Sequence, residues 1–324
     1  MTVKYILLIT VVIFFAMNMG ASGVAPSFAA SYGGKLIKRK TAMLTFAFFV
    51  IVGACLLGRN VALTLGKGLV PKEFINFNAV LIILSSASVS LFLANVLKVP
   101  QSTSQVTVSS VVGVGLYTQH LYTKALFYKI LPMWVILPLL SYILTFLLYK
   151  LVYPPERDNL HIYQLMFANE RKLKISSLAA SCYVAFAIGS NNVANAVGPL
   201  SGAGIIGIGS GLIFVAPLFG LGAWVMGEGP METAGREIVP LGKVSGTLVS
   251  FVTATLLIAA SSLGIPQSLV QLNLAAIFAI SSVKNGHKST LDQHLTRKTF
   301  IIWAVTPVMS ITIAYVLSAL FLKR

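Results

Sequence analysis

The chain has 324 residues, of which 56% are hydrophobic and only 10% are charged, and its mean hydropathy is +0.87. Because soluble domains carry about 25% charged residues, this composition excludes an ordinary soluble protein and predicts an all-α, polytopic helix bundle in a lipid bilayer. The formal net charge of +16 would suit a nucleic-acid partner. The basic residues instead lie in short loops between apolar runs, as topology determinants do, so no nucleic-acid binding is expected.

The first apolar run begins like a cleaved signal peptide. Lys4 precedes apolar residues up to Ala16, and small residues follow at 27–31. We do not expect cleavage, because the region after this run recurs later in the chain. GASGVAPSFAASYGG at 20–34 matches GSNNVANAVGPLSGA at 189–203, at an offset of 169.

Two further segments repeat in the same order, and the three repeated segments are called stations below. The segment from Gly58 to Pro71 matches the segment from Gly227 to Pro240, again at an offset of 169, and VPQSTSQV at 99–106 matches IPQSLVQL at 265–272 at an offset of 166. The chain is therefore expected to contain two homologous transmembrane repeats, joined by a cytoplasmic linker. Their predicted bounds are 1–152 and 175–324, with the linker at 153–174.

Each repeat divides into five apolar segments. In chain order they cover 3–33, 41–58, 75–97, 101–118 and 130–152, and then 175–200, 204–226, 244–263, 266–283 and 299–321. Five crossings are an odd number, so the second repeat would have inverted topology. The first and fourth segments of each repeat contain polar interruptions, which predicts broken or re-entrant helices there.

The distribution of basic residues gives the orientation. Sixteen of the 24 Lys and Arg residues fall on the side of the central linker and eight on the other side. Because basic loops stay in the cytoplasm, the linker is expected to be cytoplasmic and both termini extracytoplasmic, in a multi-pass protein of the cell membrane.

The stretch GSNNVANAVGPL at 189–200 is the most unusual of the chain. Asn191, Asn192 and Asn195 lie in a run that is otherwise apolar, between Gly189 and the pair Gly198-Pro199. Each amide needs a partner that hydrocarbon cannot supply. We expect a broken helix whose polar interruption binds a ligand, and the alternative is a buried amide network that joins helices.

Inverted repeats with interrupted helices are typical of secondary transporters, whose sites lie near mid-membrane where the repeats meet. At such sites the bare N–H groups of helix N-termini face an anion. Four polar clusters, from the first and fourth segments of both repeats, are expected to converge on the substrate. Their residues are Ser22, Gly23, Ser102, Thr103, Ser104, Asn191, Asn192, Asn195, Gln267 and Ser268.

Enzymatic chemistry is not indicated. The four histidines fall in loops, and neither a catalytic triad nor metal-ligand spacing occurs, so no cofactor and no metal are expected. GAGIIG at 202–207 fits the dinucleotide pattern, but no strand precedes it, and close helix packing explains it better. The two cysteines lie in apolar segments, which argues against a disulfide framework.

These stations resemble the inorganic phosphate transporter (PiT) family, whose halves each carry a GANDVANA-like signature and a later P-x-S-T-T-H-like turn. GSNNVANAVGPL is the close match and GASGVAPSFAAS a degenerate one. The resemblance implies a permease. The family's aspartate positions read Gly23 and Asn192 here, and its histidine position reads Gln105, so the sodium coupling of the family is not expected. FAMNMGASG with SNNVANAVGP is most similar to the sulfate permease branch.

The chemistry of the predicted site favours the same substrate. A carboxylate can accept the proton that phosphate keeps at neutral pH, whereas it would repel fully deprotonated sulfate. A site of amides, hydroxyls and backbone donors suits sulfate, with phosphate, and the related oxyanions, as alternatives. A non-transporting, oxyanion-sensing membrane protein is a third hypothesis, and assembly into a homo-oligomer is left open.

Import of a dianion also requires a driving force. Movement against a potential of about 100 mV costs about 4.6 kcal/mol, which calls for at least two cotransported cations. Since the carboxylates usual for sodium are missing, we expect proton coupling by alternating access. Glu232 is the candidate proton carrier, although an interfacial loop acid explains it as well.

Overall fold

The computed structural model describes residues 2–33, 35–96, 101–155, 157, 160, 170–228, 242–292 and 294–322. Within these ranges the chain is helical and contains no strand. The helices are α1 (Thr2–Gly33), α2 (Arg39–Leu57), α3 (Arg59–Lys67), α4 (Phe77–Val96), α5 (Thr103–Thr118), α6 (Thr123–Ala125), α7 (Leu131–Lys150), α9 (Glu170–Gly202), α10 (Ile208–Met226), α12 (Gly242–Ser262), α13 (Leu269–Asn285), α14 (His287–Asp292) and α15 (His294–Phe321). A short 3-10 helix covers Lys72–Phe74, and a π-helical segment at Leu126–Ile130 joins α6 to α7.

Seven of the described helices are long and apolar enough to cross a membrane: α1, α2, α7, α9, α10, α12 and α15. α13 and the Phe77–Leu93 part of α4 are apolar but shorter. The apolar outer faces of these helices suit contact with lipid. The prediction of an all-α, multi-pass membrane protein is confirmed.

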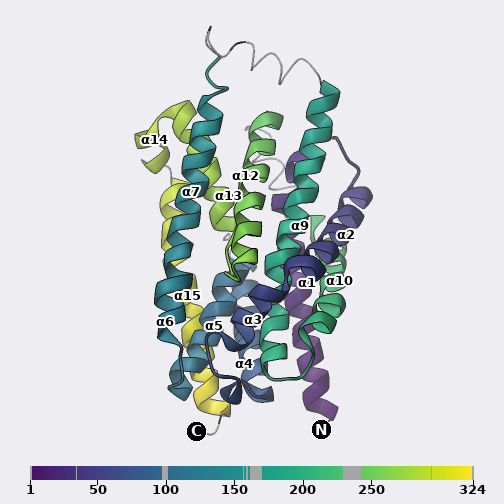
Figure 1. Ribbon diagram of the computed structural model, residues 1–324, viewed down its shortest axis with the longest axis vertical. Coiled ribbons are helices and arrows are strands. Elements are labelled where there is room, and N and C mark those ends of the chain that lie inside the picture. The colour runs from purple at the N-terminus through teal and green to yellow at the C-terminus, as the bar shows by residue number, and fades with distance from the viewer. Residues whose placement is uncertain are drawn as a thin grey trace.

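The two halves run in opposite directions. In Figure 1, α1 starts at the marked N-terminus at the bottom and runs upward, whereas α9 starts at the top and runs downward. α7 ends at the top and α15 ends at the marked C-terminus at the bottom. Both termini therefore lie at one end of the molecule and the link between the halves starts and ends at the other, as an inverted repeat requires.

The halves are interlocked rather than side by side. α2 packs on α9 as α10 packs on α1, and α15 packs on α5 as α7 packs on α13. Glycines let α2 approach α9 closely and let α10 approach α1 closely. A Cβ atom at Gly189 would overlap the carbonyl group of Val50, and one at Gly20 would overlap that of Phe219. The offset of 169 relates Gly20 to Gly189 and Val50 to Phe219, so the same close contact occurs once in each half.

The predicted break in the first segment of each repeat is wrong. α1 is one continuous helix from Thr2 to Gly33, and α9 is not broken at residues 189–200. The helix continues to Gly202 and contains Pro199. Proline removes one N–H from a helix, and here it does so only three residues before the helix ends. The amides of Asn191 and Asn195 are bonded outside α9, as described below, so they do not compete for its backbone hydrogen bonds.

The breaks lie instead between α4 and α5 and between α12 and α13. α4 and α5 lie in the lower part of the molecule, and α12 and α13 in the upper part (Figure 1). The helices that follow the two breaks, α5 and α13, are the predicted re-entrant fourth segments, and they begin at Thr103 and Leu269.

Two other segments also need comment. The GAGIIG segment joins α9 to α10 through a turn at 203–207, with φ of +70° at Gly204, which is a helix–turn–helix connection and not a nucleotide-binding loop. Most of the predicted linker lies outside the described residues, as does part of the second station.

Candidate functional site

Two re-entrant helices start at the centre of the interlocked halves, and serines cap both. Ser102 Oγ accepts a hydrogen bond of 3.1 Å from the backbone N–H of Gln105 at the start of α5. Ser268 Oγ accepts one of 3.1 Å from Gln271 N at the start of α13. Serine is a preferred N-cap because its oxygen satisfies one of the bare N–H groups of the first turn. The two starts are chemically equivalent and occupy matching places in the third station.

The side chain of Asn191 on α9 joins the two starts. Its Oδ1 accepts a bond of 3.0 Å from the backbone N–H of Gln267 and a longer one of 3.4 Å from Ser104 Oγ. Its Nδ2 donates to Ser261 Oγ and to the carbonyl oxygen of Ile265, both at 3.0 Å. One amide thus fixes the turn between α12 and α13 and touches the first turn of α5.

Asn195 lies one helical turn further along α9. Its Nδ2 donates to Ser104 Oγ at 3.2 Å and to Thr103 Oγ1 at 3.5 Å. On the other side of the network, Ser190 Oγ and Ser261 Oγ lie 2.9 Å apart. The predicted residues Thr103, Ser104, Asn191, Asn195 and Gln267 are therefore brought together, and α9 holds them as a continuous scaffold.

Helix α3, which sequence reasoning treated as a loop, braces the same turn from the first half of the chain. Asn60 Nδ2 donates to the carbonyl oxygen of Ser262 at 2.9 Å, and Thr64 Oγ1 donates to that of Gly264 at 2.7 Å. The four-residue spacing of Asn60 and Thr64 in RNVALTLGK puts both side chains on one helical face. This spacing is the sequence feature from which the role of α3 could have been predicted.

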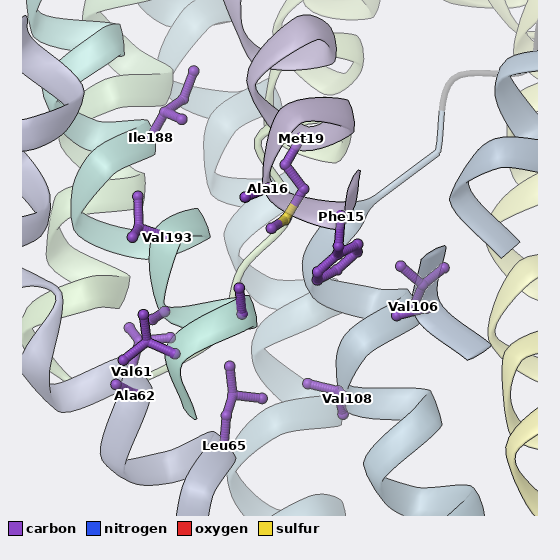
Figure 2. Close-up of a cluster of buried hydrophobic side chains, with 14 of the residues drawn as sticks. Phe15, Ala16, Met19, Val61, Ala62, Leu65, Val106, Val108, Ile188 and Val193 are labelled. Carbon is purple, nitrogen blue, oxygen red and sulfur yellow. The ribbon is translucent and has the colours of Figure 1, made fainter. Parts of the chain in front are cut away.

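Apolar side chains surround the polar network. Figure 2 shows buried residues of α1, α3, α5 and α9 together, among them Phe15, Leu65, Val106 and Val193. Asn191, Asn195, Ser104 and Gln267 are all fully buried. No Asp, Glu, Lys, Arg or His side chain is buried where the structure describes side chains. Hydrogen bonds and dipoles act strongly in such a dry environment.

Several buried polar atoms near the helix starts have no hydrogen-bond partner. They are Oδ1 of Asn192 and of Asn195, and both amide atoms of Gln101 and of Gln267. Buried polar groups are nearly always bonded, so each exception needs an explanation. Sequence reasoning singled out Gln267 but missed Gln101, although the two occupy matching places in the third station.

The remaining predicted residues are placed differently. Ser22 Oγ donates to the carbonyl oxygen of Met19 in its own helix, at 3.0 Å. A Cβ at Gly23 would touch Phe46 and Ile188, so this position packs between α2 and α9. No described hydrogen bond connects Ser22 or Gly23 with the other three clusters. Glu232 lies outside the described residues.

A pocket of about 770 Å³ reaches the first turns of both re-entrant helices. Gln105 and Gln271 line it, together with α7, α13, α14 and α15, and its walls are mainly apolar. Both glutamines are buried, and their Oε1 atoms have no partner.

Cys55 and Cys182, which lie away from this pocket, are free thiols. The described residues contain no group of three or more His, Cys, Asp and Glu side chains that could hold a metal.

Known proteins resemble this chain over nearly its whole length. A model of the phosphate transporter family matches residues 19–314. The chain is 38% identical to the sulfate permease CysP of Bacillus subtilis over 315 residues, which cover 96% of this chain and 86% of that protein. It is 25% identical to a putative phosphate permease of Thermococcus kodakarensis, in an alignment that covers 98% of both chains.

The fold also matches a solved structure, that of the sodium-dependent phosphate transporter. The TM-score is 0.83, with 23% sequence identity and 99% of each chain covered. At that identity the likeness concerns the fold, including the inverted halves.

Proposed function

The chain belongs to the phosphate transporter family, and from that premise we propose that it imports inorganic sulfate across the cell membrane, coupled to protons, by alternating access. It is an anion permease and not an enzyme, as the family and the fold show. Membership of the family shows an anion permease, whereas sulfate as substrate and protons as coupling ions are our proposal.

One observation supports an anion site more than any other: the two re-entrant turns meet at Asn191 Oδ1. Two helix N-termini with their bare N–H groups and positive dipole ends thereby point toward one region from the two halves of the chain. Ser102, Thr103, Ser104, Asn191, Asn192, Asn195, Gln267 and Ser268 are the proposed binding residues. The described contacts of Ser22 and Gly23 lie within α1 and against Phe46 and Ile188, so a binding role for these two stays a prediction from the sequence.

The absence of buried charge supports sulfate over phosphate. With no carboxylate among the buried described side chains, no fixed negative charge there repels a dianion, and amide and hydroxyl groups can donate hydrogen bonds to its oxygens. The name of the relative from Bacillus subtilis, a sulfate permease, agrees with this choice.

The second candidate is phosphate. Relatives across nearly the whole chain are named putative phosphate permeases, and the partnerless Oδ1 of Asn192 and of Asn195 could accept a hydrogen bond from the hydroxyl group of hydrogen phosphate. The same carbonyl oxygens would suit a sodium ion as coupling cation. Proton coupling rests on the missing carboxylates and on Glu232.

Both choices are tested by uptake of labelled sulfate into proteoliposomes. We expect accumulation when the outer solution is made acidic, little change when sodium is added, and weak competition by phosphate. Equal competition by phosphate would select the second candidate, and accumulation that depends only on sodium would refute proton coupling.

The proposed orientation has its own test. Reagents that cannot cross the membrane should label tags at both termini from outside the cell, and labelling only from inside would reverse the proposed orientation.

A further inference from the structure

Gln101 and Gln267 occupy equivalent places in the two halves. The offset of the third station separates them, and each directly precedes the serine that caps a re-entrant helix. Gln101 is 6% exposed and Gln267 is fully buried. In both side chains neither the amide oxygen nor the amide nitrogen has a hydrogen-bond partner.

Such an arrangement is unfavourable for the protein alone. A buried amide without partners has lost its bonds to water and gained none in return. One case could be a local defect of packing. Two cases at matching positions, both beside a helix N-terminus, indicate that the feature serves a purpose common to the two halves.

The two amides also belong to one region. The backbone N–H of Gln267 is bonded to Asn191 Oδ1, and Ser104, one turn after Gln101, is bonded to the same oxygen atom. Asn191 therefore ties both glutamine-bearing turns to the middle of α9. The bonds reach the backbone of Gln267 and the side chain of Ser104, while the amide nitrogens of both glutamines keep donors without a partner.

We propose that Gln101 and Gln267 are the paired donors that recognise the anion and determine which protonation state it has. This inference rests on the proposed function. Each Nε2 carries two N–H donors, so the pair contributes four bonds from opposite halves to a tetrahedral dianion, beside the first turns of α5 and α13. These donors need only acceptor oxygens on the ligand, so an oxyanion that carries no proton satisfies all of them.

The pair one turn further on differs. Gln105 and Gln271 have partnerless Oε1 atoms only and line the large pocket. Among the buried atoms of this pair only acceptors lack a partner, whereas in Gln101 and Gln267 the donors lack one as well.

The test is the shift in melting temperature that sulfate and phosphate produce in the purified protein. The variants are the double substitution Gln101→Met with Gln267→Met, and Gln267→Glu. Methionine keeps the length of the side chain without its hydrogen-bonding groups. Gln119→Met and Gln119→Glu are matched controls, because Gln119 is exposed at the far end of α5.

In the double Met variant, we expect the anion-free protein to melt at or above the wild-type temperature, since two partnerless amides have been removed. Half of the wild-type shift should then require at least tenfold more sulfate. Gln267→Glu should abolish the shift with sulfate but keep one with phosphate, because hydrogen phosphate can donate its proton to the new carboxylate. The Gln119 variants should behave like the wild type.

Two results would overturn the inference alone: an unchanged sulfate shift in the double Met variant, or a marked loss of its stability without anion, which would mean that the amides have structural partners. A wild-type protein that neither sulfate nor phosphate stabilises would overturn the proposed function first, and this inference with it.

Discussion

Ser141 on α7 donates a hydrogen bond of 2.8 Å to the carbonyl oxygen of Leu272 on α13. The same bond occurs a second time: Ser310 on α15 donates to the carbonyl oxygen of Val106 on α5, also at 2.8 Å. The two serines are related by the offset of the first station, and the two acceptors by that of the third. The last helix of each half is thus bonded to the re-entrant helix of the other half. A movement of one substrate-facing helix must therefore involve both halves, which suits alternating access.

Removal of either serine hydroxyl should destabilise the fold. We expect Ser141→Ala to lower the free energy of unfolding by about 1 kcal/mol and Ser310→Ala to lower it by at least as much, because Ser310 Oγ also lies 2.9 Å from the buried Ser110 Oγ. The two effects should add because the sites are separate. Denaturation of the detergent-solubilised protein measures this. Thr312→Ala, at an exposed residue that bonds only its own helix, is the control. A large loss from one serine and none from the other would contradict the equivalence of the two contacts.

The paired glycines give a second test of the interlocked fold. Gly20→Ala and Gly189→Ala should each prevent the helices from approaching, since the added Cβ would overlap a carbonyl group, and should cost several kcal/mol, about what overpacking of a core costs or more. Gly209→Ala is the matched control, because nothing lies within 4 Å of its Cβ position. It should be neutral or stabilising by up to about 1 kcal/mol. The yield of folded protein in membranes reports both, and normal yields for Gly20→Ala and Gly189→Ala together would refute the close contact.

The sequence predicted the inverted fold because repetition is visible in a single chain. The stations around Gly20 and Gly189 and around Ser102 and Ser268 stand at nearly constant offsets, and they prove to contain residues of close helix packing and of helix capping. The exact bounds of the repeats remain a prediction.

The conformation of α9 could not be predicted in the same way. A run of asparagines breaks a helix only if the amides must bond to the backbone beside them. Asn191 and Asn195 find partners on α5, on α12 and in the turn that follows α12. Which partners exist depends on contacts between residues far apart in the chain, and these have no trace in local sequence. For α3 the sequence offered only the spacing of Asn60 and Thr64, and for Gln101 only its match to Gln267 in the third station.

Polar residues of the site should matter for transport more than for folding. Asn192→Ala and Ser104→Ala are expected to reduce sulfate uptake at least tenfold, roughly the effect of losing one charge-assisted hydrogen bond, with normal insertion into the membrane. Uptake per molecule of inserted protein is the measurement. Should both variants transport at the wild-type rate, neither residue belongs to the site.

Asn191→Ala should behave differently from these two. It leaves the backbone N–H of Gln267 and the carbonyl oxygen of Ile265 without a partner, at a cost of about 1–3 kcal/mol for each group. We therefore expect loss of stability as well as of uptake. Melting of this variant at the wild-type temperature would show that Asn191 does not hold the turn in place.

Glu232 remains a prediction from the sequence. If it carries the coupling proton, Glu232→Gln should flatten the dependence of sulfate uptake on external pH, because the amide cannot titrate. Initial rates measured across a series of external pH values decide this. Glu228→Gln is a suitable control, since that neighbouring acid is paired with Arg39 at 2.8 Å. An unaltered pH profile in Glu232→Gln would remove it as the carrier.

The central claim is that two inverted halves hold one fully deprotonated oxyanion between their re-entrant helix starts. An experimental structure determined with molybdate, an electron-dense analogue of sulfate, tests it most directly. We expect density for the anion within hydrogen-bond distance of the first turns of both α5 and α13, beside Gln101 and Gln267. Density in a different part of the molecule, with no anion between these turns, would contradict the account.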